Sequence, residues 1–216
     1  MAAVYSPLRE QPRARPHERG HWQRRPVVAG LRILGGAARG RRLQGESLPG
    51  LRPTSARVRE ALFDVLGARV TGCTFLDLYA GTGAVGLEAL SRGAARAVFV
   101  ESSRRAVRAL AANLKVLSET GAGDILEMDA GQALYRLEER GERFGVVFLD
   151  PPWDLDDGGL ILQQAARAVA PSGVLVVEHR TGRPPSVAPD SGLTPGRAYR
   201  HGDASLSLFL AGASSR

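Results

Sequence analysis

Length, composition and charge already exclude several classes of protein. The chain has 216 residues, 44% of them hydrophobic, and a formal net charge of +7, which suits one globular domain with a small appendage. Cys73 is the only cysteine, so an internal disulfide framework is excluded. No apolar run approaches the roughly 20 residues of a membrane span. We therefore expect a cytoplasmic protein that has no membrane partner.

The positive charge is concentrated at the front of the chain. Residues 1–69 hold 14 arginines and five acidic residues, whereas residues 70–216 hold 15 basic and 17 acidic ones. The front therefore carries +9 and the remainder −2. Such an asymmetry favours a polyanionic partner such as nucleic acid. Residues 1–29, which are rich in arginine and proline and have no apolar periodicity, are predicted to form a flexible basic tail.

Residues 30–69 are expected to form an RNA-binding extension. The segments 31–34 and 39–43 flank a glycine pair and predict a small hairpin. Thr54 is expected to cap a helix whose apolar residues recur at helical spacing until Gly67. Interleaved glycines would let the arginines of this region lie close to a phosphate backbone. The candidate RNA-binding residues are Arg32, Arg39, Arg41, Arg42, Arg52, Arg57 and Arg59. Arg57 and Arg59 are predicted to fall outside the apolar stripe of the helix.

From residue 74 onward, strand and helix patterns alternate. The patterns predict strands at 74–78, 96–101, 124–128, 144–150 and 173–178, and helices at 84–92, 103–118, 130–140 and 158–169. This alternation is typical of a parallel sheet covered on both faces. Two strand-like segments around Gly202-Asp203 predict an antiparallel hairpin over 197–210 at the sheet edge. Residues 70–216 would thus form one α/β domain.

A glycine-rich loop follows the first predicted strand. Gly81, Gly83 and Gly86 match the pattern G-x-G-x-x-G, which usually marks a dinucleotide site. Asp77 precedes the loop at the strand end, where its carboxylate would repel a pyrophosphate. The same charge favours the sulfonium and ammonium groups of S-adenosylmethionine, which carries no phosphate. The loop therefore indicates S-adenosylmethionine as the cofactor.

Two further acidic residues follow later strands. Glu101 ends the second predicted strand, 24 residues after Asp77, where a carboxylate can accept hydrogen bonds from both ribose hydroxyls. Asp129 follows the third, where it would either accept from an adenine amino group or cap the next helix. Because the carboxyl ends of parallel strands meet at one edge, we expect the three acids to converge.

The fourth predicted strand ends in Asp150-Pro151-Pro152-Trp153, in which two prolines fix the backbone and remove two N–H donors. The exocyclic amino group of a base is a poor nucleophile because its lone pair is delocalised into the ring. Two acceptors on its hydrogens help it toward tetrahedral geometry, and the Asp150 carboxylate and the Pro151 carbonyl would supply them. Trp153 would stack on a base turned out of its helix or loop. The motif predicts methyl transfer to a base amino group by positioning and electrostatics.

The acidic loop after this motif is not expected to hold a metal. Asp154, Asp156 and Asp157 have no histidine or cysteine partners at metal-ligand spacing, so we interpret them as solvated loop residues and expect no metal.

Several motifs together resemble the RsmD family of bacterial 16S rRNA guanine-N2 methyltransferases. The front-end motifs are Arg32-Ile33-Leu34-Gly35-Gly36, Arg39-Gly40-Arg41, Arg52-Pro53-Thr54 and Arg57-Val58-Arg59-Glu60-Ala61-Leu62-Phe63. Asp77-Leu78-Tyr79-Ala80-Gly81-Thr82-Gly83 and residues 150–153 are similar to the family's cofactor and target-base motifs. The resemblance covers about residues 30–210. Trp153 stands where the family often has Tyr or Phe, and Ala56 where an acidic residue is common.

The resemblance implies a Rossmann-like class I methyltransferase fold, with a seven-stranded, mostly parallel sheet, an antiparallel C-terminal hairpin and a small N-terminal extension. It also implies a cytosolic monomer that methylates one guanine of 16S rRNA in the small ribosomal subunit. By the same resemblance, residues 150–153 would hold the guanine. The implied cofactor-binding residues are Asp77, Tyr79, Ala80, Gly81 and Gly83 for the methionine part, Glu101 for the ribose, and Asp129 with Ala130 for the adenine.

Other functions remain open at the level of sequence. An enzyme that methylates adenine N6 in DNA or RNA would carry the same tetrapeptide, although no long insertion for DNA recognition is visible. Methyl transfer to a protein amide usually goes with Asn at position 150 rather than Asp. A noncatalytic RNA-binding protein of ribosome assembly is disfavoured by intact acids at 77, 101 and 150. A nicotinamide-dependent oxidoreductase is disfavoured by Asp77 and the proline motif.

Overall fold

The computed structural model describes residues 31–45, 54–117, 122–153 and 158–213. The expected tail over residues 1–29 lies outside this part of the chain, as do Arg52, Asp154, Asp156 and Asp157. The helices are α1 (Ala56–Leu66), the short 3-10 helix η1 (Gly67–Arg69), α2 (Ala84–Ser91), α3 (Arg104–Val116), α4 (Ala130–Glu139) and α5 (Gly158–Arg167). Among the described helices, none combines the length and the apolar composition that crossing a membrane requires.

Seven strands form one sheet in the order β3-β2-β1-β4-β5-β7-β6. The strands are β1 (Thr74–Leu78), β2 (Arg96–Glu101), β3 (Ala122–Glu127), β4 (Phe144–Leu149), β5 (Val169–Arg180), β6 (Leu193–His201) and β7 (Ala204–Ala211). The first five strands pair in parallel, and β7 pairs antiparallel with both β5 and β6. The predicted α/β fold with its C-terminal hairpin is therefore confirmed. The strand order reverses at β1, which lies between β2 and β4, and ligands of such sheets bind at this point.

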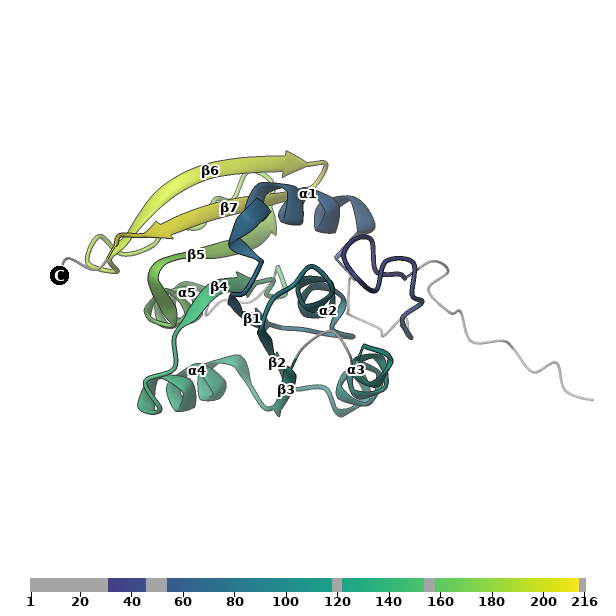
Figure 1. Ribbon diagram of the computed structural model, residues 1–216. Helices are drawn as coiled ribbons and strands as arrows, with labels where there is room; N and C mark the ends of the chain where they lie inside the picture. Colours follow the sequence, from purple (N-terminus) through teal and green to yellow (C-terminus); the bar gives the residue numbers. More distant parts are fainter. Residues whose placement is uncertain (1–30, 46–53, 118–121, 154–157, 214–216) are drawn as a thin grey trace, which may run out of the picture.

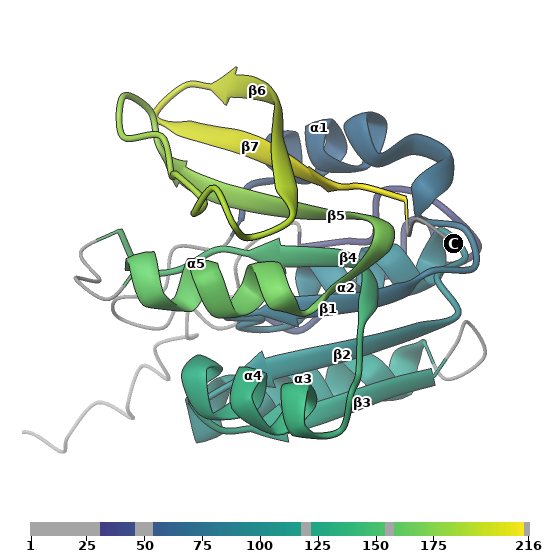
Figure 2. The same ribbon diagram turned by 90° about the vertical axis from the view of Figure 1, so that its left-hand side faces the viewer.

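The sheet is covered on both faces, as Figures 1 and 2 show. Helices α1, α2 and α3 bury apolar side chains against one face, where Phe75, Phe99 and Phe148 belong to one core cluster. Helices α4 and α5 pack on the other face, against alternate residues such as Leu76 and Val147. Because successive side chains of a strand point to opposite faces, this alternation fixes which strand-end residues share a face.

Strand β5 begins earlier than its apolar run predicts. The expected helix over 158–169 ends at Arg167, and Val169 already pairs with Phe144 of β4. The register then shifts, because Ser172 adopts a φ of 61° and the extra residues form an irregularity in the strand. The prediction was therefore wrong over residues 169–172, which belong to β5. Residue 169 was predicted to end the helix, and residues 170–172 were predicted to lie outside the strand.

The front end, residues 31–45, forms the predicted small hairpin and packs into the same core. Leu31, Ile33 and Leu43 are buried in the cluster that covers the α1 face of the sheet. Arg32 and Arg42 form an antiparallel bridge, and backbone hydrogen bonds of 3.0 and 2.9 Å join residue 33 to residue 41 and residue 43 to residue 31. The chain here is held by contacts to the domain, because the segment is too short to bury its apolar residues against itself.

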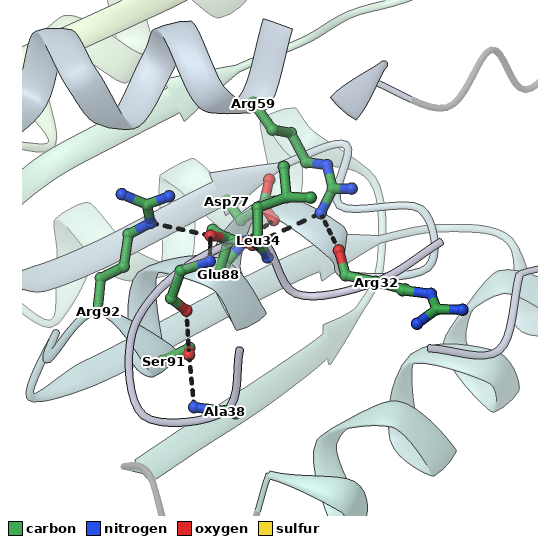
Figure 3. A network of polar contacts seen from close by, with 10 residues as sticks. Arg32, Leu34, Ala38, Arg59, Asp77, Glu88, Ser91 and Arg92 are labelled. Atoms are coloured by element: carbon green, nitrogen blue, oxygen red, sulfur yellow. Dashed lines mark hydrogen bonds and ion pairs between the residues drawn. The ribbon is translucent and has the colours of Figure 1, made fainter. Parts of the chain in front are cut away.

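A buried polar network fastens the front end to α2 (Figure 3). The Glu88 carboxylate accepts hydrogen bonds from the backbone N–H groups of Leu34 and Gly35, each at 2.7 Å, and from Arg92 Nε at 2.9 Å. Ser91 Oγ accepts from the Ala38 N–H and donates to the Gly35 carbonyl. These bonds add to the hairpin's own backbone pairing and satisfy further backbone polar groups of the segment.

Gly36 permits the close approach of this segment to α2. Its φ is 77°, and a Cβ atom built on it would lie 1.8 Å from the carbonyl oxygen of Ser91. The Ala37 N–H donates to that same carbonyl at 2.7 Å. The glycine pair of the front-end motif is therefore explained by packing against the end of α2.

Candidate active site

Three acidic side chains lie near one another at the carboxyl edge of the sheet. Asp77 is in β1, Glu101 ends β2, and Asp150 directly follows β4. Each of the three lies two residues after a phenylalanine that packs in the core beneath α1–α3. Because alternate residues of a strand point to the same side, all three acids are on that face of the sheet. The negative charges of Asp150 and Glu101 both act on Asp77. The structure therefore brings these three predicted site residues together.

Asp77 is 2% exposed, and its Oδ2 accepts a hydrogen bond from the Gly86 N–H at 2.8 Å. Burial raises the pKa of Asp77 to about 7, the Gly86 N–H opposes the shift, and the charges of Asp150 and Glu101 add to it. A carboxylate that is held in a dry site beside two other acids is suited to a cationic ligand.

The glycine loop bends sharply between β1 and α2. Tyr79 has a φ of 63°, which is unusual for a residue with a side chain, and Gly81 and Gly83 have φ values of 55° and 82°. Gly83 is the N-cap of α2 and provides no side-chain cap, so backbone N–H groups of the first turn face the loop. A Cβ atom at Gly83 would lie 2.2 Å from Leu110 Cδ1, so a side chain here would displace Leu110 in addition to the strain of the positive φ.

Glu101 and Asp129 both bond to backbone N–H groups. Glu101, 8% exposed, accepts from the Gly81 N–H at 2.8 Å and from the Ser103 N–H at 2.7 Å, so it connects the glycine loop to the start of α3. Asp129 is exposed and caps α4, accepting from the Gly131 N–H at 2.8 Å. Of the two roles left open for Asp129, the structure contains the cap.

The target-base motif lies beside the front end. Asp150 Oδ2 accepts a hydrogen bond from Thr54 Oγ1 at 3.0 Å. Trp153 is half-buried and packs against the core cluster beneath α1, while Pro152 is exposed. The prediction that Thr54 caps α1 was wrong, because the N-cap is Ser55, whose Oγ accepts from the Val58 N–H.

The predicted RNA-binding arginines differ in exposure. Arg59 is 1% exposed, so its prediction as an RNA contact was wrong. Its guanidinium donates to the Arg32 carbonyl at 3.1 Å and lies 3.7 Å from Glu88 Oε2. Burial lowers the pKa of Arg59, and the charge of Glu88 opposes this shift. Arg41 is exposed and donates to the Val116 carbonyl. The other candidates in the described residues are also exposed, and they are Arg32, Arg39, Arg42 and Arg57.

Sequence reasoning missed Glu178. This residue is 6% exposed at the carboxyl end of β5, one position after Val177, which pairs with Leu149 of β4. Glu178 lies two residues after Val176, which belongs to the core cluster beneath α1, so its side chain points to the same face of the sheet as Asp150. The available signal was an acidic residue at the end of an apolar run, the same pattern that identified Glu101.

The fold and this site together define a class I methyltransferase of Rossmann-like fold. The strand order, the glycine loop after β1 and the proline motif after β4 all agree with that class. The chain belongs to the family described as Conserved hypothetical protein 95, whose model matches residues 31–209. The resemblance to the RsmD family is thereby confirmed.

Named relatives support this membership. Ribosomal RNA small subunit methyltransferase D of Escherichia coli K12 is 43% identical over 123 residues, which are 57% of this chain and 60% of the relative. The protein of that name from Haemophilus influenzae is 32% identical over 156 residues, 71% of this chain and 81% of the relative. The structure of a hypothetical protein from Thermus thermophilus is 35% identical, with a TM-score of 0.70 over 84% of this chain and 99% of that one.

Proposed function

We propose that the chain is an S-adenosylmethionine-dependent methyltransferase that methylates the N2 amino group of a guanine in 16S rRNA of the small ribosomal subunit. The observation that carries this proposal is the meeting of Asp77, Glu101 and Asp150 on one face of the carboxyl edge. The glycine loop after β1 and the residues after β4 therefore lie at the same edge of the sheet, which supports one site for cofactor and base. The relatives named as small-subunit rRNA methyltransferases support the choice of substrate.

The residues at the loop fit this cofactor by their charge. Three acids in close proximity disfavour a pyrophosphate and favour a ligand with positive charge. When bound, the cofactor supplies an electrophilic methyl group on a sulfonium. Asp77, Gly81 and Gly83 would hold its methionine part, with Tyr79 and Ala80 in the same turn. Glu101 would hold the ribose, and Asp129 with Ala130 the adenine.

Cofactor affinity is expected to depend on pH through Asp77. Its pKa is raised to about 7, so the free site is increasingly protonated as the pH falls below 7. A cationic ligand binds the charged carboxylate better, so the Kd for S-adenosylmethionine should fall as pH rises from about 5.5 to about 7.5. Above this window the ligand's own amino group starts to lose its proton. Calorimetry at several pH values tests this, and Asp77→Asn should flatten the profile; an equally steep profile in that variant would contradict the assignment.

The raised pKa of Asp77 also makes the stability of the ligand-free protein depend on pH, and this stability falls as pH rises, whereas cofactor affinity increases. Between the ordinary carboxyl pKa and about 7, the folded protein binds more protons at Asp77 than the unfolded chain does. The contribution of this group to stability is therefore greatest at low pH and is lost as pH rises through 7. The buried acid thus opposes folding at neutral pH, where it favours a cationic ligand.

The residues of the target-base motif act on the substrate by accepting hydrogen bonds from its amino group. The Asp150 carboxylate and the Pro151 carbonyl accept from the two N–H groups of the guanine amino group, which moves its lone pair out of conjugation. Trp153 stacks on the base and limits its orientation. The proton that the nitrogen loses after methyl transfer leaves by way of Asp150 to solvent. Positioning and electrostatics account for this step.

RNA contact is assigned to the exposed arginines of residues 30–69. Arg32 and Arg42 are bridge partners on the front end, so two cations lie side by side where a phosphate can bind both. Replacing both by glutamine is expected to weaken RNA binding and to reduce the slope of log K against log salt by about 0.7 for each phosphate that is no longer neutralised. A filter-binding salt series measures this. The control is Arg140→Gln with Arg143→Gln, the same charge change at the amino edge of β4, which should leave the slope unaltered.

The proposed function is tested by methyl transfer to its substrate. Purified protein and radiolabelled cofactor are incubated with small subunits that lack the modification, with naked 16S rRNA, and with DNA, and the modified nucleotide is then mapped. We expect label on one guanine, as N2-methylguanine. Label on adenine N6 would instead establish the other amino-methyltransferase reaction, and absence of label in all three would refute the enzyme assignment.

A further inference from the structure

Thr54 connects the front end to the target-base motif. Its Oγ1 donates to Asp150 Oδ2 at 3.0 Å, across a separation of 96 residues in sequence. The helix that follows does not use this hydroxyl, because Ser55 accepts from the Val58 N–H and caps α1. The hydroxyl of Thr54 is thus committed to Asp150 and not to the local backbone.

The hydrogen bond from Thr54 gives Asp150 a donor that the two residues after it cannot provide. An aspartate at the start of a turn ordinarily accepts from the N–H groups of the residues that follow it. Here those residues are Pro151 and Pro152, which have no N–H. In addition, Asp77 lies close enough for its charge and that of Asp150 to repel each other. A hydroxyl donor offsets this repulsion and restricts rotation of the carboxylate.

The donor stands on a fixed element. Thr54 immediately precedes α1, whose residues Val58 and Leu62 are buried in the core. Arg59 of α1 donates to the Arg32 carbonyl and faces Glu88, which holds the front end against α2. Thr54 therefore has a defined place relative to the sheet and can set the orientation of Asp150.

We propose that Thr54 is a positioning residue, which holds the Asp150 carboxylate so that its acceptor lone pairs face the amino group of the target base. The inference rests on the proposed function. It assigns the threonine of the Arg52-Pro53-Thr54 motif to the methyl-transfer site, so that one residue beside the proposed RNA-binding region also belongs to that site.

Three variants test this role. Thr54→Val keeps the shape and removes the hydroxyl, and is expected to lower kcat for methyl transfer about tenfold, the effect of one hydrogen bond to a charged group. The KM for RNA and the Kd for S-adenosylhomocysteine should change less than about twofold, since the substitution touches neither the RNA surface nor the cofactor loop. Thr54→Ser should restore kcat to near the wild-type value. Ser55→Ala, the adjacent control, should lower the Tm through the missing cap while leaving kcat unaltered.

The outcomes separate this inference from the proposed function. If wild-type protein transfers methyl groups to the small subunit and Thr54→Val has a normal kcat, the positioning role is refuted. It is also refuted if the loss of kcat comes with an equal loss of cofactor binding, or if Thr54→Ser fails to rescue, because Thr54 would then act through general structure. Wild-type protein that transfers no methyl group refutes the proposed function itself.

Discussion

Replacing Asp150 by alanine is expected to lower kcat for methyl transfer by at least about a hundredfold, the usual effect of losing a group that handles protons in the transition state. The carboxylate is the only charged side chain of residues 150–153, and it has a fixed donor in Thr54. Without it, the amino group of the base keeps its lone pair in conjugation and is a weak nucleophile. Single-turnover assays with radiolabelled cofactor and small subunits measure the loss.

Cofactor binding gives the control for this prediction. Asp150 adds to the negative charge around Asp77 and accepts from Thr54 Oγ1, and the proposed cofactor-binding residues do not include it. The Kd for S-adenosylhomocysteine should therefore change little in Asp150→Ala, as measured by calorimetry. Asp150→Asn retains one acceptor and should keep more activity than alanine. Undiminished turnover in Asp150→Ala would refute the assigned role.

Replacing Glu88 by alanine is expected to destabilise the folded protein by about 3–5 kcal/mol, the cost of breaking a buried ion pair. Glu88 is fully buried and accepts from Leu34 N–H, Gly35 N–H and Arg92 Nε. The substitution leaves two backbone donors without an acceptor and the buried Arg59 without its counter-charge. Urea unfolding measures the free energy.

The matched control for Glu88 is a surface ion pair. Glu138 of α4 lies 3.6 Å from Arg167, with 43% of its side chain exposed. Glu138→Ala should cost no more than about 1 kcal/mol because solvent screens exposed pairs. Glu88→Gln keeps an acceptor for one N–H group and should fall between the two. A loss for Glu88→Ala as small as that for Glu138→Ala would show that Glu88 contributes little to holding the front end.

The order of elements and the location of the acids follow from the sequence alone. Apolar runs with β-branched residues alternate with helical spacing, and this requires parallel strands whose carboxyl ends share one edge. Asp77, Glu101 and Asp150 were identified because each ends or follows such a run. The sequence prediction failed for a residue that is polar by type but buried by its surroundings. Arg59 was predicted to fall outside the apolar stripe, but it shares the buried face of α1 with Leu62 and Phe63, and Glu88 provides the charge that lets it be buried.

Sequence by itself determined the class of fold and located the glycine loop and the Asp-Pro-Pro-Trp motif, since these depend on local periodicity and on residue types at fixed spacing. Only the tertiary structure decided what the front end does. Contacts of Thr54 with Asp150 and of Glu88 with Leu34 join residues 96 and 54 positions apart. No local pattern specifies such pairs, because a hydroxyl or a carboxylate bonds equally well to its own helix or to a distant strand. The hydrogen-bond partner of each side chain is decided by which groups the packing of the whole domain brings next to it.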